Sequence, residues 1–127
     1  MKKRTIIVVA ITMSLALSDL IGQELKNVQV LPYKTKKEIF PFMKNIVAKS
    51  LGVKCKFCHN IKDYSIDENP HKLVAREMMS MVNSINVRME SIQEIAQNAG
   101  MKHWDEAPVI ECWVCHRGIT KPEFKRP

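Results

Sequence analysis

The sequence predicts a small, mainly α-helical domain with little β structure. The strongest periodic signal is a run of apolar residues at helical spacing, namely Val74, Met78, Met81, Val82, Ile85 and Met89. Only residues 25–31 alternate apolar and polar side chains, and a single strand cannot form a sheet. A five-residue motif, Cys-x-x-Cys-His, occurs twice, at residues 55–59 and 112–116. We therefore expect helices arranged around two equivalent sites.

The first 22 residues have the pattern of a secretory signal peptide. Residues 1–4 are basic after the initiator methionine, residues 5–17 are almost wholly apolar, and cleavage is expected after Ser18 or Gly22. The alternative is an uncleaved membrane anchor, but the apolar run is shorter than the span of about 20 residues that a bilayer requires. We therefore expect an exported, periplasmic protein with one domain at 23–127.

The first helix is expected to begin at Thr35. Thr35-Lys36-Lys37-Glu38 has the form of a capping box, and an apolar stripe with Met43 on it follows at helical spacing. Pro41 lacks a backbone donor and crowds the preceding turn, which predicts a kink or a restart there. Gly52 is suited to the position after a helix, so this element should end before the first motif.

A polar loop is expected at residues 60–69, and a long helix after it. Asn69 and Pro70 suit the N-cap and the first helical position, and Asn98 with Gly100 should end the helix. The pattern allows one helix, or two with a break near Asn86. Residues 101–108 are expected to be a loop that leads to the second motif.

The repeated motif is typical of covalent haem c attachment. Two cysteines separated by two residues can both reach the vinyl groups at one edge of a porphyrin, and the adjacent histidine can ligate the iron. The expected attachment residues are Cys55, Cys58, Cys112 and Cys115, and the expected proximal ligands are His59 and His116. A structural zinc site and a pair of disulfides are the alternatives, but both leave the two histidines unexplained.

The Cys-x-x-Cys-His motif identifies the proximal histidines but not the sixth ligands of the two irons. Methionine and histidine are the common choices in electron-transfer haems, and Met43 is available in the first half of the chain. In the second half Met78 and Met81 share the apolar helical face, and core packing is an equally good explanation for either. Met79 lies about 100° from Met78 around the helix and should point elsewhere. His71 and His103 are rival ligands, although lone histidines are more often structural or exposed.

Several stretches together resemble the tetrahaem cytochrome subunit of photosynthetic reaction centres. They are residues 26–31, the helix with Met43, Cys55-Lys56-Phe57-Cys58-His59, residues 74–86 and residues 112–118. The resemblance covers nearly all of residues 26–124 and matches a two-haem half of that subunit. It implies Met43 as sixth ligand of the first haem and Met78, rather than Met81, as that of the second. It also implies two haems packed closely about a local pseudo-twofold axis.

The chain departs from that subunit in two respects. It has two haem motifs where the subunit has four, and residues 74–96 contain no histidine, so the bis-histidine haem of the subunit has no counterpart. Two buried porphyrins would supply much of the core of a chain with few aromatic residues. We therefore expect a small multihaem c-type fold whose helices pack on two haems, with a poorly folded apoprotein.

The favoured function is that of an exported dihaem c-type cytochrome that carries electrons and catalyses no reaction. Its expected partners are redox proteins, either free in the periplasm or assembled in a membrane complex, and it needs neither a small-molecule substrate nor nucleic acid. The formal net charge of +7 is a mild excess without the basic and aromatic clustering of nucleic-acid binders. The alternative is a peroxidase-like haem enzyme or a gas sensor, which requires one open iron position.

Overall fold

The computed structural model describes residues 25–123, so the expected signal peptide lies outside the described residues. The elements are α2 (Lys36–Pro41), η1 (Phe42–Val47), α3 (Ala48–Leu51), η2 (Cys55–Phe57), α4 (Pro70–Asn98) and α5 (Cys112–His116). Between residues 25 and 123 there is no β-strand, which confirms the mainly α prediction. Within the same span, no helix has both the length and the apolar character needed to cross a membrane.

α2, η1 and α3 follow one another without a break and form one helical rod. The capping box is present, because Glu38 accepts the backbone N–H of Thr35 at 2.9 Å and the side chain of Thr35 accepts the N–H of Glu38. The irregularity predicted at Pro41 takes the form of a π-helical segment, η1, since proline cannot donate into the α-helical ladder. Gly52 ends the rod with a φ of +66°, as predicted.

α4 is one continuous helix of 29 residues with no break at Asn86. At its start the side chain of Asn69 accepts the backbone N–H of His71 at 2.9 Å, and Pro70 occupies the first turn. At its end Gly100 has a φ of +78°, a conformation that favours glycine. Both predicted boundaries of this helix are confirmed.

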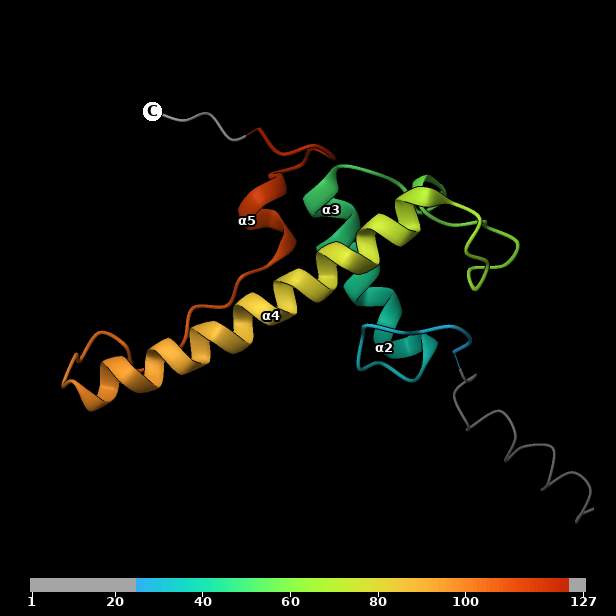
Figure 1. Ribbon diagram of the computed structural model, residues 1–127. Helices are drawn as coiled ribbons and strands as arrows, with labels where there is room; N and C mark the ends of the chain where they lie inside the picture. The colour runs from blue at the N-terminus through green and yellow to red at the C-terminus, as the bar shows by residue number, and fades with distance from the viewer. Residues whose placement is uncertain (1–24, 124–127) are drawn as a thin grey trace, which may run out of the picture.

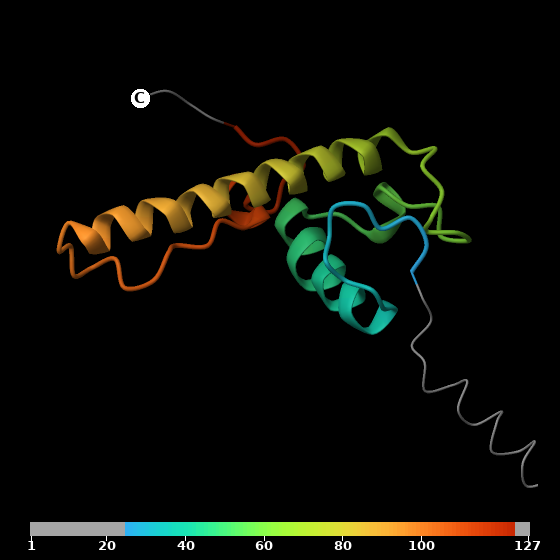
Figure 2. The same cartoon turned by 60° about the horizontal axis from the view of Figure 1, so that its bottom comes forward.

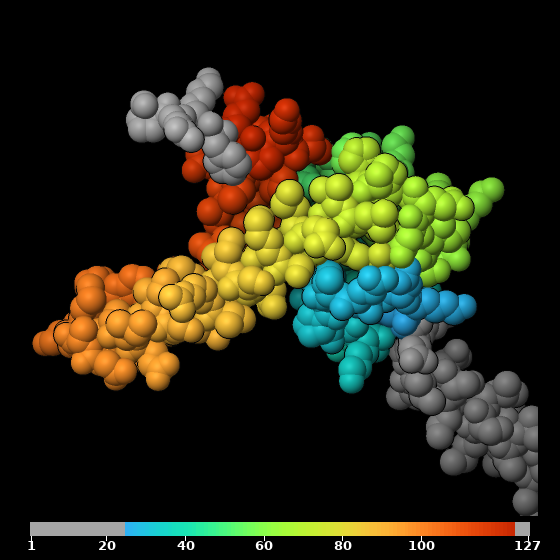
Figure 3. Space-filling model, in the orientation of Figure 1, coloured from blue at the N-terminus to red at the C-terminus, as the bar shows by residue number. Residues whose placement is uncertain are grey.

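Residues 25–31 form an N-terminal arm that lies on the body of the molecule. The arm is not a regular strand, and the prediction of an extended segment is wrong at Asn27, whose φ is +62°. The reason is tertiary, because the side chain of Asn27 donates to the carbonyl of Ser65 at 2.6 Å. In Figure 3 the arm, drawn in blue, lies between the α2 region and the start of α4.

α4 passes across the rod in Figure 1, and Figure 2 shows that the whole rod lies on one side of α4. α5 packs against α3 and η1. The C-terminal half of α4 extends beyond this crossing and is accompanied mainly by the loop of residues 99–111 (Figure 2). The second motif, in α5, therefore lies beside the rod, and the first motif lies beside the start of α4, where the side chain of Asn69 bonds to the carbonyl of Phe57. The far half of α4 projects away from both motifs (Figure 1).

The described polypeptide encloses almost no apolar core. Ala96 is the one buried hydrophobic residue between residues 25 and 123. Large apolar side chains such as Val74, Met81 and Trp113 are about half exposed. A domain of this size normally buries well over half of its unfolded surface, so the chain itself does not supply its core.

Candidate functional site

The first motif forms a tight turn that directs its side chains to one cavity. η2 begins at Cys55, and the backbone N–H of His59 bonds to the carbonyl of Cys55 at 3.0 Å. Cys55, Cys58 and His59 all line a cavity of about 1150 Å³. Both thiols are free, so they are available for thioether bonds.

Two methionines from other elements line the same cavity. Met43 comes from η1, and Met79 comes from α4. Pockets for drug-sized ligands usually measure roughly 300–1,000 Å³, so this cavity has room for a porphyrin. The structure thus brings the predicted first set, Met43 with His59 and the two cysteines, to one cavity. Met79 was assigned to neither haem from the sequence, and its position 100° from Met78 is what aims it here.

His59 has the environment of a neutral imidazole ligand. Burial lowers the pKa of His59, and the positive charge of Lys72 lowers it further. The ring packs on Tyr64 with centroids 5.1 Å apart. Its Nδ1 is buried without a hydrogen-bond partner among the described residues. Burial also raises the pKa of Cys58 and so keeps the sulfur as a thiol.

The second motif forms the short helix α5. Nδ1 of His116 lies 2.9 Å from the carbonyl oxygen of Ile119. When Nδ1 donates to that oxygen, the tautomer leaves the lone pair of Nε2 free, which is the usual arrangement of a metal-binding histidine. Burial raises the pKa of Cys112, as it does for Cys58.

The apolar face of α4 near the second motif is uncovered by the chain. Met78, Met81 and Ile85 lie three and four residues apart on this face and are 45%, 49% and 38% exposed. On α5, Trp113 and Val114 are also about half exposed. A flat apolar cofactor attached at Cys112 and Cys115 fits such a surface. Met78 and Met81 both remain candidates for the second iron by geometry.

Two asparagine side chains tie the motifs to α4. Asn69 donates to the carbonyl of Phe57 within the first motif at 2.9 Å. Asn86 donates to the carbonyl of Ile110 at 3.0 Å and accepts the N–H of Ile110 at 2.7 Å, two residues before Cys112. From the sequence Asn69 was only an N-cap and Asn86 only a possible break. No sequence signal distinguishes such anchors, because their partners are backbone groups 12 and 24 residues away.

A backbone contact joins the segment after the second motif to the segment before the first. The N–H of Gly118 donates to the carbonyl of Ser50 at 2.8 Å, and Ser50 is buried. A Cβ atom on Gly52 would clash with the carbonyl oxygen of Gly118. The chain therefore requires glycine at 52 both for this approach and for the positive φ.

The rival histidines lie elsewhere. His71 is exposed and packs on Phe57, with ring centroids 4.2 Å apart, and its Nδ1 is 3.2 Å from the side chain of Asn69. His103 is exposed in the loop beside Trp104. Neither lines the cavity of the first motif.

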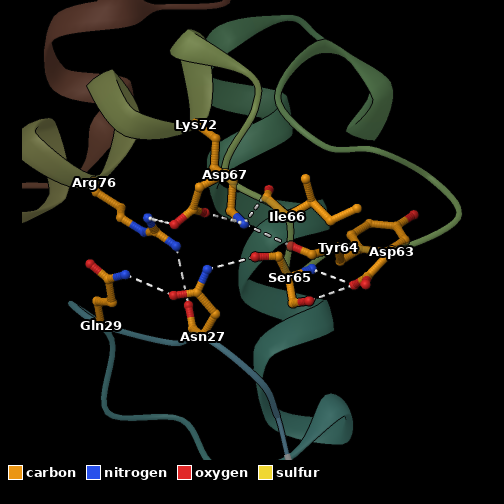
Figure 4. Close-up of polar contacts among 9 residues, drawn as sticks. All are labelled: Asn27, Gln29, Asp63, Tyr64, Ser65, Ile66, Asp67, Lys72 and Arg76. Carbon is orange, nitrogen blue, oxygen red and sulfur yellow. Dashed lines mark hydrogen bonds and ion pairs between the residues drawn. The ribbon is translucent and has the colours of Figure 1, made fainter.

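A polar network closes the first cavity on the side of the N-terminal arm (Figure 4). Asp67 forms ion pairs with Arg76 and Lys72, each at 2.8 Å, and Arg76 also donates to the carbonyl of Asn27 at 3.2 Å. The nitrogen of Lys72, a buried residue, donates to two loop carbonyls as well, each at 2.8 Å. The hydrogen bond from Arg76 is the main reason that the pKa of Asp67 lies well below its usual range, and Asn27 and Lys72 add to it.

Comparison of the sequence with known proteins identifies relatives of this chain. A sequence model of the photosynthetic reaction centre cytochrome C subunit family matches residues 1–125. Cytochrome c-554 of Chloroflexus aurantiacus is 34% identical over 90 residues, which cover 71% of this chain and 20% of that protein. The chain thus spans about a fifth of the length of that relative. No solved structure gives a significant match.

The family match covers both Cys-x-x-Cys-His motifs and all elements of the described fold. It agrees with a chain whose four cysteines are free and whose apolar surfaces are left uncovered, as expected where covalent haem completes the core. We conclude that the chain belongs to the photosynthetic reaction centre cytochrome c subunit family and is a c-type cytochrome.

Proposed function

We propose that the protein is an exported dihaem electron carrier in which each iron has one histidine and one methionine ligand. The observation that carries this proposal is the cavity of about 1150 Å³, which is lined by Cys55, Cys58, His59 and Met43. These residues come from two elements and supply both thioether sulfurs and both axial ligands for one haem. In solution, bound haem c would supply one-electron chemistry between ferric and ferrous iron.

For the second centre we propose Cys112 and Cys115 as attachment residues and His116 as proximal ligand. Met78 is the proposed sixth ligand and Met81 the alternative. The hydrogen bond of His116 to Ile119 supports this role, since it fixes the ring and the tautomer. The exposed face with Met78 and Met81 supports it as well, because the second haem would cover it.

The chain holds the two centres near each other. The contact of Gly118 with Ser50 joins the end of the second motif to the segment just before the first. We infer that the haems pack closely enough for direct electron exchange between them. We also propose that donor and acceptor are redox proteins, free in the periplasm or part of a membrane complex such as the family name indicates.

A mass measurement tests the cofactor. The chain, produced together with the cytochrome c maturation machinery, should gain the mass of two haems and keep it after denaturation. Cys55→Ser with Cys58→Ser should lose one haem, and Cys112→Ser with Cys115→Ser should lose the other. A chain with no covalent haem would overturn the proposal and favour a zinc or disulfide protein.

A redox titration with axial-ligand spectroscopy tests the methionines. Met43→Ala should change one haem and Met78→Ala the other, with loss of the methionine-to-iron signature and a lower potential. Met81→Ala is the matched control, which should keep both signatures. If Met81→Ala removes the signature instead of Met78→Ala, the alternative ligand is correct.

Carbon monoxide distinguishes the carrier from a haem enzyme or a gas sensor. Two six-coordinate ferrous haems should bind it slowly and incompletely. Rapid, full binding at one haem of the wild type would show an open iron position and refute the pure carrier function.

A further inference from the structure

The charges of the chain are divided between its two ends. Residues 25–62 carry nine lysines and one acidic residue, Glu38. Residues 86–111, which form the far half of α4 and its loop, carry five acidic residues and two basic ones. The overall charge hides this division. The fold places the first group beside the N-terminal half of α4 and the second group along the far half of that helix (Figure 1).

The fold gathers the lysines around the mouth of the first cavity. We define the basic rim as five of the exposed lysines that line this cavity: Lys26, Lys37, Lys44, Lys54 and Lys62. They come from the N-terminal arm, α2, η1 and the loops on both sides of the first motif. Among the lining residues between 25 and 123, Asp63 is the one acidic residue, and it accepts hydrogen bonds from Ser65 at 2.6 and 2.9 Å.

The charges of the basic rim face solvent. Among residues 25–123 the ion pairs are those of Asp67 with Lys72 and Arg76, so no lysine of the rim is paired with a carboxylate. Two apolar side chains of the cavity lining, Phe40 and Val30, are 57% and 38% exposed. An apolar surface surrounded by a ring of like charges is typical of a transient protein interface.

We propose that the basic rim is the docking surface for an acidic electron-transfer protein that exchanges one electron with the first haem. This inference rests on the dihaem function proposed above. One electron passes between the redox group of the partner and the first iron, so that one is oxidised as the other is reduced and no bond forms or breaks.

Two features favour an acidic protein over an anionic membrane as the binding partner of the basic rim. Membrane-surface binding usually relies on a long amphipathic helix with an apolar face, whereas the rim is built from several short segments around a cavity and α2 has only six residues. The acidic far end of the molecule would repel the same partner. Repulsion at one end and attraction at the other orient an acidic protein toward the first haem.

The test measures electron transfer from two donors of opposite charge to the oxidised holoprotein. The acidic probe is reduced flavodoxin, and the cationic probe is the methyl viologen radical. The flavodoxin rate constant should fall at least about tenfold between low and high salt, because salt screens steering, and the methyl viologen rate should not fall.

Charge-reversal variants locate the surface. The rim variant Lys37→Glu, Lys44→Glu, Lys62→Glu should lower the flavodoxin rate at low salt about tenfold or more. The control variant Arg88→Glu, Lys102→Glu, Lys121→Glu changes the net charge equally at exposed positions outside the rim and should alter the rate less than twofold. Haem content and reduction by dithionite show that both variants are intact.

Other results would overturn the proposal or replace the proposed partner. Equal flavodoxin rates in the two variants would overturn it. Rim-dependent binding to phosphatidylglycerol vesicles with unchanged flavodoxin rates would replace the protein with a membrane. Salt-sensitive self-association through the rim, with unchanged flavodoxin rates, would replace it with a second copy of the chain. Absence of haem would defeat the dihaem function and the docking surface together, whereas a dihaem protein without charge preference would defeat only the docking surface.

Discussion

Replacing Asn86 with alanine should loosen the second haem site without touching a ligand. The amide of Asn86 makes two hydrogen bonds with Ile110, of 3.0 and 2.7 Å, and these fix the chain two residues before Cys112. Each such bond contributes about 0.5–1.5 kcal/mol net, and the two backbone groups of Ile110 would lose their partner in a half-buried position. The free energy of unfolding should therefore fall by about 2–3 kcal/mol.

Urea denaturation of the holoprotein measures this loss. With a slope of about 1–3 kcal/mol per M, the midpoint should fall by roughly 0.7–3 M. Asn83→Ala is the matched control, because it is the same substitution at an exposed position of the same helix. Its midpoint should change little. If the two variants unfold at the same urea concentration, the amide of Asn86 does not anchor the second motif and the reasoning fails.

Three further predictions follow from other contacts. Gly52→Ala should push the two motifs apart, because the new Cβ would clash with the carbonyl of Gly118. The influence of each haem on the potential of the other should then weaken. An unchanged redox titration would show that the contact between Gly52 and Gly118 does not set the distance between the haems. Asp67→Asn should destabilise the arm near neutral pH. Because Arg76 depresses the pKa of Asp67, the stabilisation is fully present above the ordinary value of 3.8 and is lost as pH falls below it, so the wild type and the variant should differ at pH 7 and converge in acid. A difference in unfolding midpoint that does not depend on pH would count against the ion pairs. A chain with all four cysteines replaced by serine should lack a cooperative unfolding transition, because the polypeptide between residues 25 and 123 buries only Ala96 of its apolar residues; a sharp transition by circular dichroism would refute this.

The predictions that held depend on contacts between residues close in sequence. The capping box of Thr35 and Glu38, the start of α4 at Asn69 and the end of the rod at Gly52 each involve groups within about one turn. The one extended segment failed at Asn27, because its conformation is stabilised by Ser65, 38 residues away. Local patterns carry no information about such a partner.

The sequence by itself determined the mainly helical class and the two Cys-x-x-Cys-His motifs, because attachment chemistry and helix capping act over a few neighbouring residues. Only the tertiary structure brought Met43 and Met79 to the cavity of the first motif, tied Asn86 to Ile110, and gathered separate lysines into one rim. These features depend on how the rod, the arm and α4 cross. That crossing is set by contacts between residues far apart in the chain, which periodicity and spacing do not encode.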